Sequence, residues 1–203
     1  MKAVFPGTAS ANGQPATLGE AGKHPATLGV MGGGQLGRMF VHAAQRLGYD
    51  TAVLDPDPQS PAGLVSHHHI QTDYNDEAGL RRLAFVCDAV TTEFENVPAA
   101  ALSTLATTLP VAPSAASVAI AQNRIEEKAH FNACATVSGV SVAPYVVIET
   151  LEQLQNVAAN LLPGILKTAR MGYDGKGQVR VKSTTELAAA WGDLNSVACV
   201  LEK

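Results

Sequence analysis

The stretch from Lys167 to Gln178 combines three glycines with three cations and follows the apolar pair Ile165–Leu166. Glycines allow backbone N–H groups to turn towards a bound anion, and neighbouring cations favour a polyanion. Residues 167–182 hold five cations and one carboxylate, whereas the whole chain has a formal net charge of −4. A positive loop in an acidic protein predicts a phosphate-binding site and not a general nucleic-acid surface.

A second glycine-rich segment, Gly32–Gly37, has the Gly-x-Gly-x-x-Gly spacing, and Asp55 lies 18 residues beyond it. In dinucleotide-binding proteins this pattern places pyrophosphate at a helix N-terminus and an acidic side chain on the ribose. The residues alone leave three interpretations open: an NAD(P) site, a phosphate or ribose-phosphate site at the same helix N-terminus, or a tight turn without a ligand.

Three further groups of polar residues have weaker signals. Glu93 and Glu95 would share one face if their strand continued, which allows a paired-carboxylate site or a solvated loop. The consecutive histidines 67–69 would point to alternate faces of a strand, which disfavours a common metal ion. Arg124 and Lys128 are four residues apart and can point the same way on a helix, although a charged run is more often a solvated face.

These residues need elements that position them, and the hydrophobic pattern predicts such elements. Predicted strands alternate with predicted helices up to Pro113, which is typical of a doubly wound parallel sheet in an α/β fold. The carboxyl ends of such strands meet at one edge, so Gly32–Gly37, Asp55 and 93–96 should converge there. The predicted strands are 27–31, 51–54, 68–72, 89–92 and 111–112, and the predicted helices are 38–47, 77–85 and 99–107.

After Pro113 the pattern changes to an α+β lobe, with the cationic glycine loop inside a β-hairpin. The elements predicted here are a helix over 114–138, an extended segment over 142–148, a helix over 151–160, strands 164–167 and 179–182, a helix over 185–191 and a strand over 197–201. We therefore expect a flexible N-terminal extension over 1–26, a first domain over 27–115 and a second over 116–203.

Composition limits the class of protein. The chain has 203 residues, of which 46% are hydrophobic and 16% charged, enough for a substantial core. Its three cysteines, Cys87, Cys134 and Cys199, lie far apart without Cys-x-x-Cys spacing, which disfavours a zinc or redox site. We expect all three to be buried free thiols in a reducing compartment. No apolar run of about 18 residues is present, so no membrane helix is expected. Residues 1–26 lack an apolar segment after the first cation, which disfavours a secretory signal, and the prediction is a cytoplasmic protein.

Four segments in this order resemble one family. They are Gly-Gly-Gly-Gln-Leu-Gly-Arg-Met (32–39), Thr-Glu-Phe-Glu-Asn-Val-Pro (92–98), the Arg124…Lys128 helix, and Lys-Thr-Ala-Arg-Met-Gly-Tyr-Asp-Gly-Lys-Gly-Gln (167–178). The chain is similar over roughly 27–203 to the N5-carboxyaminoimidazole ribonucleotide synthases, ATP-grasp enzymes of purine biosynthesis. That resemblance implies a pre-ATP-grasp domain of Rossmann-like type, followed by part of an ATP-grasp domain. It also implies a reaction of 5-aminoimidazole ribonucleotide, bicarbonate and MgATP through carboxyphosphate.

The resemblance also implies roles for individual residues. Catalytic roles fall to Lys167, Tyr173 and Lys176. The ATP-binding residues implied are Arg124, Lys167, Gly172, Tyr173, Asp174, Gly175, Lys176, Gly177, Gln178 and Glu202, of which Gly172 to Gln178 form a lid. The ribonucleotide contacts implied are Gly34, Gln35, Leu36, Glu93, Glu95, Tyr173 and Lys176, and which of the two glutamates touches the substrate is left open.

The resemblance covers only part of the family's length. Family members continue for roughly as long again, and that part carries the Mg²⁺ ligands, so no metal ligand is expected among these 203 residues. We expect the chain to be inactive alone and the full-length protein to be a homodimer, without nucleic-acid or membrane partners. Two alternatives remain: an NAD(P)-dependent oxidoreductase domain and a non-catalytic ribonucleotide-binding module.

Overall fold

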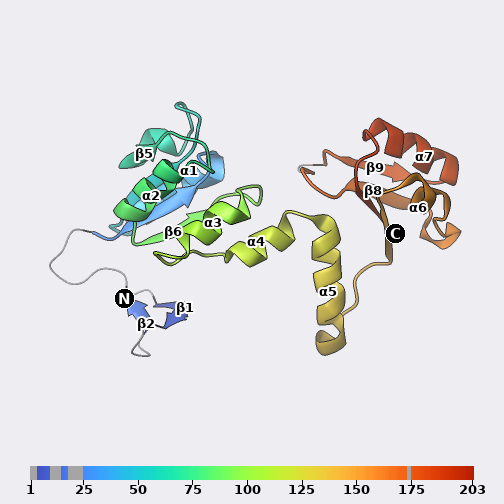
Figure 1. The fold of residues 1–203 in the computed structure, drawn as a ribbon, viewed down its shortest axis with the longest axis horizontal. Coiled ribbons are helices and arrows are strands. Elements are labelled where there is room, and N and C mark those ends of the chain that lie inside the picture. Colours follow the sequence, from blue (N-terminus) through green and yellow to red (C-terminus); the bar gives the residue numbers. More distant parts are fainter. Residues whose placement is uncertain (1–3, 10–14, 18–24, 173–174) are drawn as a thin grey trace. The chain divides into compact units, whose positions relative to one another are not determined.

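The computed structural model describes all residues except 1–3, 10–14, 18–24 and 173–174 (Figure 1). The chain divides into two compact units, residues 1–118 and residues 119–203. Each unit has its own sheet and its own hydrophobic core. Two predicted site residues, Tyr173 and Asp174, lie outside the described residues.

The main sheet of unit 1 has four parallel strands in the order β5-β4-β3-β6. The first strand of the sheet, β3, lies between β4 and β6, so the chain winds outwards in both directions from it, as in doubly wound folds. This confirms the predicted α/β class. The strands are β3 (Thr27–Met31), β4 (Asp50–Leu54), β5 (His68–Ile70) and β6 (Ala89–Thr92).

Helices cover both faces of this sheet because alternate side chains of each strand point to opposite faces. Val30 of β3 and Val53 of β4 pack with Val41 of α1 on one face. Met31 and Leu54, the next residue of each strand, belong to a larger core that α2 and α3 complete. The helices are α1 (Gln35–Arg46), α2 (Glu77–Val86) and α3 (Ala99–Leu105), with the short 3-10 turn η1 (Gly63–Val65) between β4 and β5.

Unit 1 also contains two strands that the sequence did not predict. β1 (Val4–Ala9) and β2 (Pro15–Thr17) pair antiparallel as a separate two-stranded sheet. Part of the expected N-terminal extension is therefore paired as β-structure. The flexibility of residues 1–26 stays a prediction. The predicted strand 111–112 is present only as a single parallel bridge between Val90 and Val111.

The sheet of unit 2 is antiparallel in the order β7-β10-β8-β9. One face packs on α6 and α7 through a core that includes Leu166, Leu201 and Trp191. Alternation therefore directs Lys167 and Glu202, neighbours of those core residues in sequence, to the other face. The elements are β7 (Tyr145–Ile148), α6 (Leu151–Gln155), η2 (Ala159–Leu161), β8 (Gly164–Thr168), β9 (Gln178–Val181), α7 (Thr184–Asp193) and β10 (Cys199–Glu202).

Two helix predictions were wrong in extent. The single helix expected over 114–138 is two helices, α4 (Ala115–Ala121) and α5 (Arg124–Ser138). Asn123 separates them, because its extended backbone starts a new helix and its side chain accepts a hydrogen bond from the Ile125 N–H group. The helix expected over 151–160 ends at Gln155, and a turn follows that brings Val157 and Leu161 into the core.

Among the described residues, no helix is both long enough and apolar enough to cross a membrane.

Candidate functional site

The glycine-rich turn after β3 meets the carboxyl ends of the two neighbouring strands. The Gly33 N–H group donates to Asp55 Oδ2 at 2.7 Å, and the Gly34 N–H group donates to Glu93 Oε1 at 2.6 Å. The Gly37 N–H group donates to the second oxygen of Glu93. The expected convergence at the carboxyl edge of the sheet is thus observed within unit 1.

Close packing within the chain explains why these turn positions are glycines. A Cβ atom added to Gly33 would lie 2.5 Å from Ser60 Cβ, and one added to Gly34 would lie 2.6 Å from Glu93 Oε1. A Cβ atom on Gly37 would lie 2.8 Å from the carbonyl oxygen of Gly32. The backbone of the turn is therefore pressed against the protein itself, as expected of a tight turn between strand and helix.

The two carboxylates in this region are already engaged, which argues against a dinucleotide site. Glu93 occupies the N-terminus of α1, where a dinucleotide-binding protein holds its pyrophosphate. Asp55 is buried and accepts hydrogen bonds from Gly33, from the Tyr74 hydroxyl at 2.7 Å and from the Asp57 N–H group. Burial, together with the hydrogen bond to Asp55, raises the pKa of Tyr74.

The remaining candidates of unit 1 are on its surface. Gln35, Leu36 and Glu95 are exposed, and the Leu36 side chain is 63% exposed. Glu95 accepts a hydrogen bond from the Asn96 amide at 3.2 Å. Because β6 ends at Thr92, the two glutamates do not share a strand face, and the structure does not form the paired-carboxylate site.

In unit 2, two lysines share one glutamate on the face of the sheet opposite to α6 and α7. Lys128 Nζ and Lys167 Nζ each lie 2.7 Å from a different oxygen of Glu202. The three side chains are 12%, 22% and 18% exposed, respectively. Burial by itself would raise the pKa of Glu202, but the hydrogen bonds from Lys128 and Lys167 outweigh it and lower that pKa. The cluster carries one net positive charge.

Helix α5 lies on this face through a polar stripe. Arg124, Lys128 and Asn132 are spaced four residues apart, so they share one side of the helix. Arg124 Nη1 donates to the Thr168 carbonyl at 2.7 Å, and the Asn132 amide donates to the Tyr145 hydroxyl at 2.9 Å. None of the α5 side chains whose burial is described is fully buried, so these contacts position the helix more than apolar packing does.

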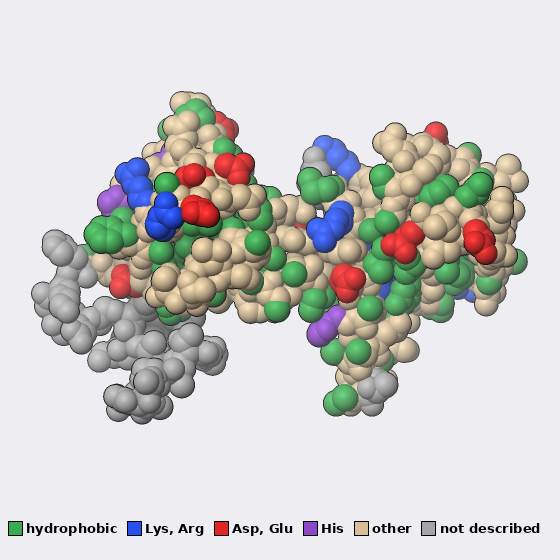
Figure 2. Space-filling view, in the orientation of Figure 1, with side chains coloured by type: hydrophobic (Ala, Val, Ile, Leu, Met, Phe, Trp, Pro, Cys, Tyr) green, Lys and Arg blue, Asp and Glu red, His purple; other side chains and the backbone are tan. Residues whose placement is uncertain are grey.

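The cationic glycine loop connects β8 to β9 beside this cluster. The Thr168 N–H group donates to the Gly177 carbonyl at 2.8 Å, which closes the loop at its base. Gly175 and Gly177 have positive φ angles of 78° and 68°, a conformation that side chains rarely adopt. Lys176 and Gln178 are exposed, and Figure 2 shows Lys and Arg side chains, in blue, at the end of unit 2 that carries this loop.

A pocket of about 520 Å³ lies at the base of the loop within unit 2. Its walls come from the start of α5, the end of β8 and the turn between α7 and β10. Arg170 supplies a cation, Glu149 and Asp193 supply carboxylates, and Met171 and Val197 supply exposed apolar surface. The loop, the cluster and this pocket together could hold a phosphorylated ligand with an apolar part.

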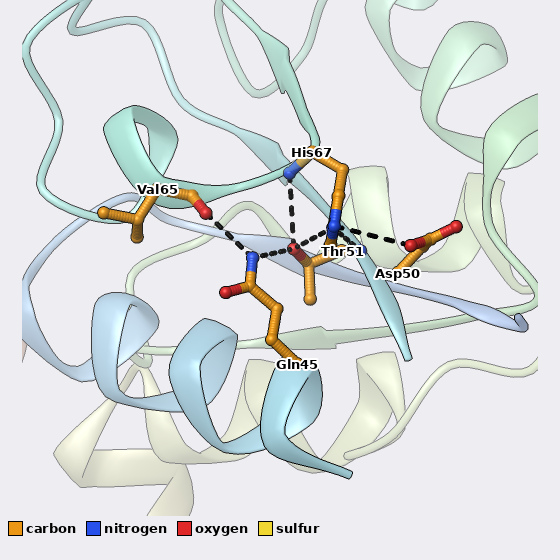
Figure 3. A network of polar contacts seen from close by, with 5 residues as sticks. All are labelled: Gln45, Asp50, Thr51, Val65 and His67. Carbon is orange, nitrogen blue, oxygen red and sulfur yellow. Dashed lines mark hydrogen bonds and ion pairs between the residues drawn. The ribbon is translucent and has the colours of Figure 1, made fainter. Parts of the chain in front are cut away.

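His67, the first of the three consecutive histidines, lies in a network of polar contacts with neighbouring residues of unit 1 (Figure 3). His67 Nδ1 accepts from the Thr51 N–H group at 3.0 Å, and its Nε2 lies 3.5 Å from Asp50. Gln45 bonds the Thr51 hydroxyl and the Val65 carbonyl in the same network. Within the described residues, no group of three or more His, Cys, Asp or Glu side chains is arranged to hold a metal ion.

Lys128 is the residue that sequence reasoning missed. Its spacing from Arg124 was noticed, but its partner Glu202 is 74 residues away in sequence. Only the docking of α5 on the sheet brings them together. Cys87 and Cys199 are buried free thiols, as expected. Cys134 is an exposed free thiol, so the expectation that all three cysteines are buried was wrong for this residue.

Comparison with known proteins assigns both units. Residues 25–122 match the ribonucleotide synthetase preATP-grasp domain, and residues 133–203 match the ATP-grasp domain. The N5-carboxyaminoimidazole ribonucleotide synthase of Brucella melitensis is 42% identical over 183 residues, which cover 89% of this chain and 49% of that protein.

Solved structures agree with this assignment. N5-carboxyaminoimidazole synthetase from Staphylococcus aureus, complexed with ADP, matches with a TM-score of 0.81 and 35% identity, covering 89% of this chain and 48% of that one. The Aspergillus clavatus enzyme, in complex with ADP and 5-aminoimidazole ribonucleotide, matches with a TM-score of 0.75 and 32% identity, covering 89% and 46%. The chain spans about half the length of the relatives it matches. It is therefore a homologue of the N5-carboxyaminoimidazole ribonucleotide synthases, a family of ATP-grasp proteins.

Proposed function

We propose that this chain forms part of an ATP-dependent ligase that carboxylates 5-aminoimidazole ribonucleotide with bicarbonate in purine biosynthesis. The observation that carries the proposal is the cationic cluster around Lys167, beside a glycine loop, in the unit that matches the ATP-grasp domain. Relatives of the chain have been solved with ADP and with 5-aminoimidazole ribonucleotide, which supports both substrate classes. The products would be N5-carboxyaminoimidazole ribonucleotide, ADP and phosphate.

In this proposal the two units have different tasks. Unit 2 binds the ATP phosphates through Lys167, Arg124 and the N–H groups of the loop from Gly172 to Gln178, and Glu202 begins the adenine site. Phosphoryl transfer to bicarbonate needs positioning and charge neutralisation more than covalent chemistry, which suits such a set. A closed loop, with Tyr173 and Lys176, would exclude water and protect carboxyphosphate from hydrolysis.

Unit 1 binds the ribonucleotide in the same proposal. Gly34, Gln35 and Leu36 lie at the carboxyl edge of the sheet, where ligands bind in open α/β folds. Glu93 is committed to the turn, so Glu95, which is exposed, is the better placed of the two for substrate contact. Domain limits of 1–26, 27–115 and 116–203, a homodimer and a cytoplasmic location complete the proposal.

Mg²⁺ would neutralise the ATP phosphates during transfer. The Mg²⁺ ligands that the resemblance implies lie in the part of the family's length that this chain does not match.

Nucleotide binding by the 203-residue polypeptide tests the proposal. Isothermal titration should show binding of ATP, and NADH should not compete with it. Lys167→Ala should weaken ATP binding by about 10- to 150-fold, since a hydrogen bond to a charged group contributes about 1.5–3 kcal/mol. Lys182→Ala, which removes an exposed cation from the same unit, is the matched control. Tight NADH binding, or ATP binding that Lys167→Ala leaves unchanged, would contradict the proposal.

An activity assay complements the titration. Because the chain spans about half the length of its relatives, we expect no ADP release above background from residues 1–203 with all three substrates. Turnover by this polypeptide would show that its own residues suffice for the reaction.

A further inference from the structure

Lys128 has a position that anchoring of α5 alone does not require. Its side chain is 12% exposed, its ammonium group lies 2.7 Å from Glu202 Oε1, and it is 5.5 Å from the centre of the Tyr145 ring. Arg124 and Asn132 already join the same side of α5 to the sheet through hydrogen bonds. The Lys128–Glu202 ion pair is thus a third contact of α5, and its largely buried charges indicate an electrostatic role.

Glu202 engages Lys167, the residue with the central role in the proposed phosphate site. Lys167 Nζ lies 2.7 Å from Glu202 Oε2, so this carboxylate occupies the ammonium group that a phosphate would use. A polyphosphate on this face therefore competes with Glu202 for Lys167. When Lys167 turns towards the phosphate, Glu202 loses one of its two cations.

A carboxylate that is only 18% exposed is costly to leave without a partner. Lys128 is bound to the other oxygen of Glu202, so it can stay in place while Lys167 moves. Without Lys128, Lys167 would be the single cation on this glutamate among the ion pairs of the described residues, and the phosphate would have to separate a one-to-one ion pair.

We propose that Lys128 is a positioning residue of the nucleotide site: it holds Glu202 as a paired carboxylate and so leaves Lys167 transferable to the phosphates of ATP. The proposal rests on the proposed function, because it concerns the same site. It assigns Lys128 to the control of Lys167 and not to contact with the ligand.

Binding of inorganic tripolyphosphate and of ATP to the 203-residue chain tests this at fixed ionic strength. Tripolyphosphate reports phosphate binding without any adenine contact. Lys128→Met should weaken binding of both ligands by at least about tenfold, the effect of one lost charge-assisted contact. Lys182→Met is the control for loss of one positive charge, since Lys182 is exposed on the same unit. Lys128→Arg should restore binding to within about threefold of wild type, because it keeps the cation.

Glu202→Gln provides an independent test, because it removes the competitor for Lys167. It should strengthen tripolyphosphate binding, and in the Lys128→Met background it should recover most of the lost affinity. This double variant also removes both charges of a largely buried pair, which proteins tolerate better than loss of one. It therefore remains informative should Lys128→Met fold poorly, as checked by circular dichroism.

The outcomes separate the two proposals. Equal effects of Lys128→Met and Lys182→Met, or no recovery with Glu202→Gln, would overturn the role of Lys128 while leaving the nucleotide site intact. Adenosine has no phosphate, so a loss of adenosine binding as large as that of ATP would mark Lys128 as a structural anchor only. A wild-type chain that binds neither ATP nor tripolyphosphate would overturn the proposed function, and the inference with it.

Discussion

At the scale of single residues, Glu93 and Glu95 show how two similar side chains acquire different tasks. Glu93 accepts from the Gly34 and Gly37 N–H groups and so caps α1, a helix whose N-cap residue has no side chain to do so. Glu95 is exposed and bonded to Asn96. A negative charge at a helix N-terminus also interacts favourably with the helix dipole.

Glu93→Gln should therefore lower the free energy of unfolding by about 1–3 kcal/mol, because one backbone N–H group would face an amide donor instead of an acceptor. Urea unfolding followed by circular dichroism measures this change. The control Glu95→Gln should stay within about 0.5 kcal/mol of wild type, as exposed substitutions usually do. Equal stability of the two variants would mean that Glu93 does not cap the helix.

Glu202 makes stability depend on pH at the residue scale. Its pKa is lowered in the folded state from the ordinary value of 4.5, so its ion pairs stabilise the fold above that pH. The stabilisation is lost as the pH falls through the lower, folded pKa. The difference in unfolding free energy between wild type and Glu202→Gln should be about 1–3 kcal/mol near pH 7 and should shrink as the pH falls below 4.5 and through the lowered pKa of the folded state. A difference that is independent of pH would contradict this assignment.

At the scale of elements, glycines in helices separate two physical roles. Gly37 lies in the first turn of α1, where an added Cβ atom would lie 2.8 Å from the Gly32 carbonyl and 3.0 Å from Glu93. Gly192 lies in α7, where an added Cβ atom would meet nothing within 4 Å. The first glycine permits a close approach of the helix and the turn, and the second merely weakens its helix.

The same substitution should thus have opposite effects at the two positions. Gly37→Ala should destabilise the protein by about 1–3 kcal/mol through the forced shift of the turn. Gly192→Ala should stabilise it by about 0.5–1 kcal/mol, the difference in helix propensity. Chemical unfolding of both variants decides this, and a stabilising Gly37→Ala would refute the close approach.

At the scale of the whole molecule, the two units have separate cores that different probes can follow. Leu83 is fully buried in the core of unit 1, and Leu187 is buried in that of unit 2. The chain has one tryptophan, Trp191, which packs in the core of unit 2 and donates from Nε1 to the Val197 carbonyl. Tryptophan fluorescence therefore reports on unit 2, whereas circular dichroism reports on both units.

Each leucine should affect its own unit when it is truncated. Leu187→Ala should shift the fluorescence transition by about 2–5 kcal/mol, the usual effect of such a cavity. Leu83→Ala should shift the circular dichroism transition and leave the fluorescence midpoint nearly unchanged. Equal shifts in both signals for both variants would show that the units unfold as one cooperative body.

The sequence by itself determined most elements and the class of both units. Hydrophobic periodicity and turn glycines act within a few residues, so strands β3 and β6 were predicted with their observed limits. The meeting of Gly32–Gly37, Asp55 and Glu93 followed from the rule that parallel strands end at one edge. The predicted hairpin around the cationic loop is also present as β8 and β9.

Only the tertiary structure decided which partner each charged side chain takes. In the register of β10 against β8, Glu202 lies opposite Ile165 and Val200 lies opposite Lys167. Glu202 and Lys167 therefore lie on the same face of the sheet, where Glu202 forms ion pairs with Lys167 and Lys128. A shift of one residue would turn Glu202 to the other face, and no local pattern specifies that register. Likewise, Glu93 became the cap of α1 instead of half of a carboxylate pair. Long-range partners depend on how elements dock, and the docking minimises buried unpaired charge over the whole unit.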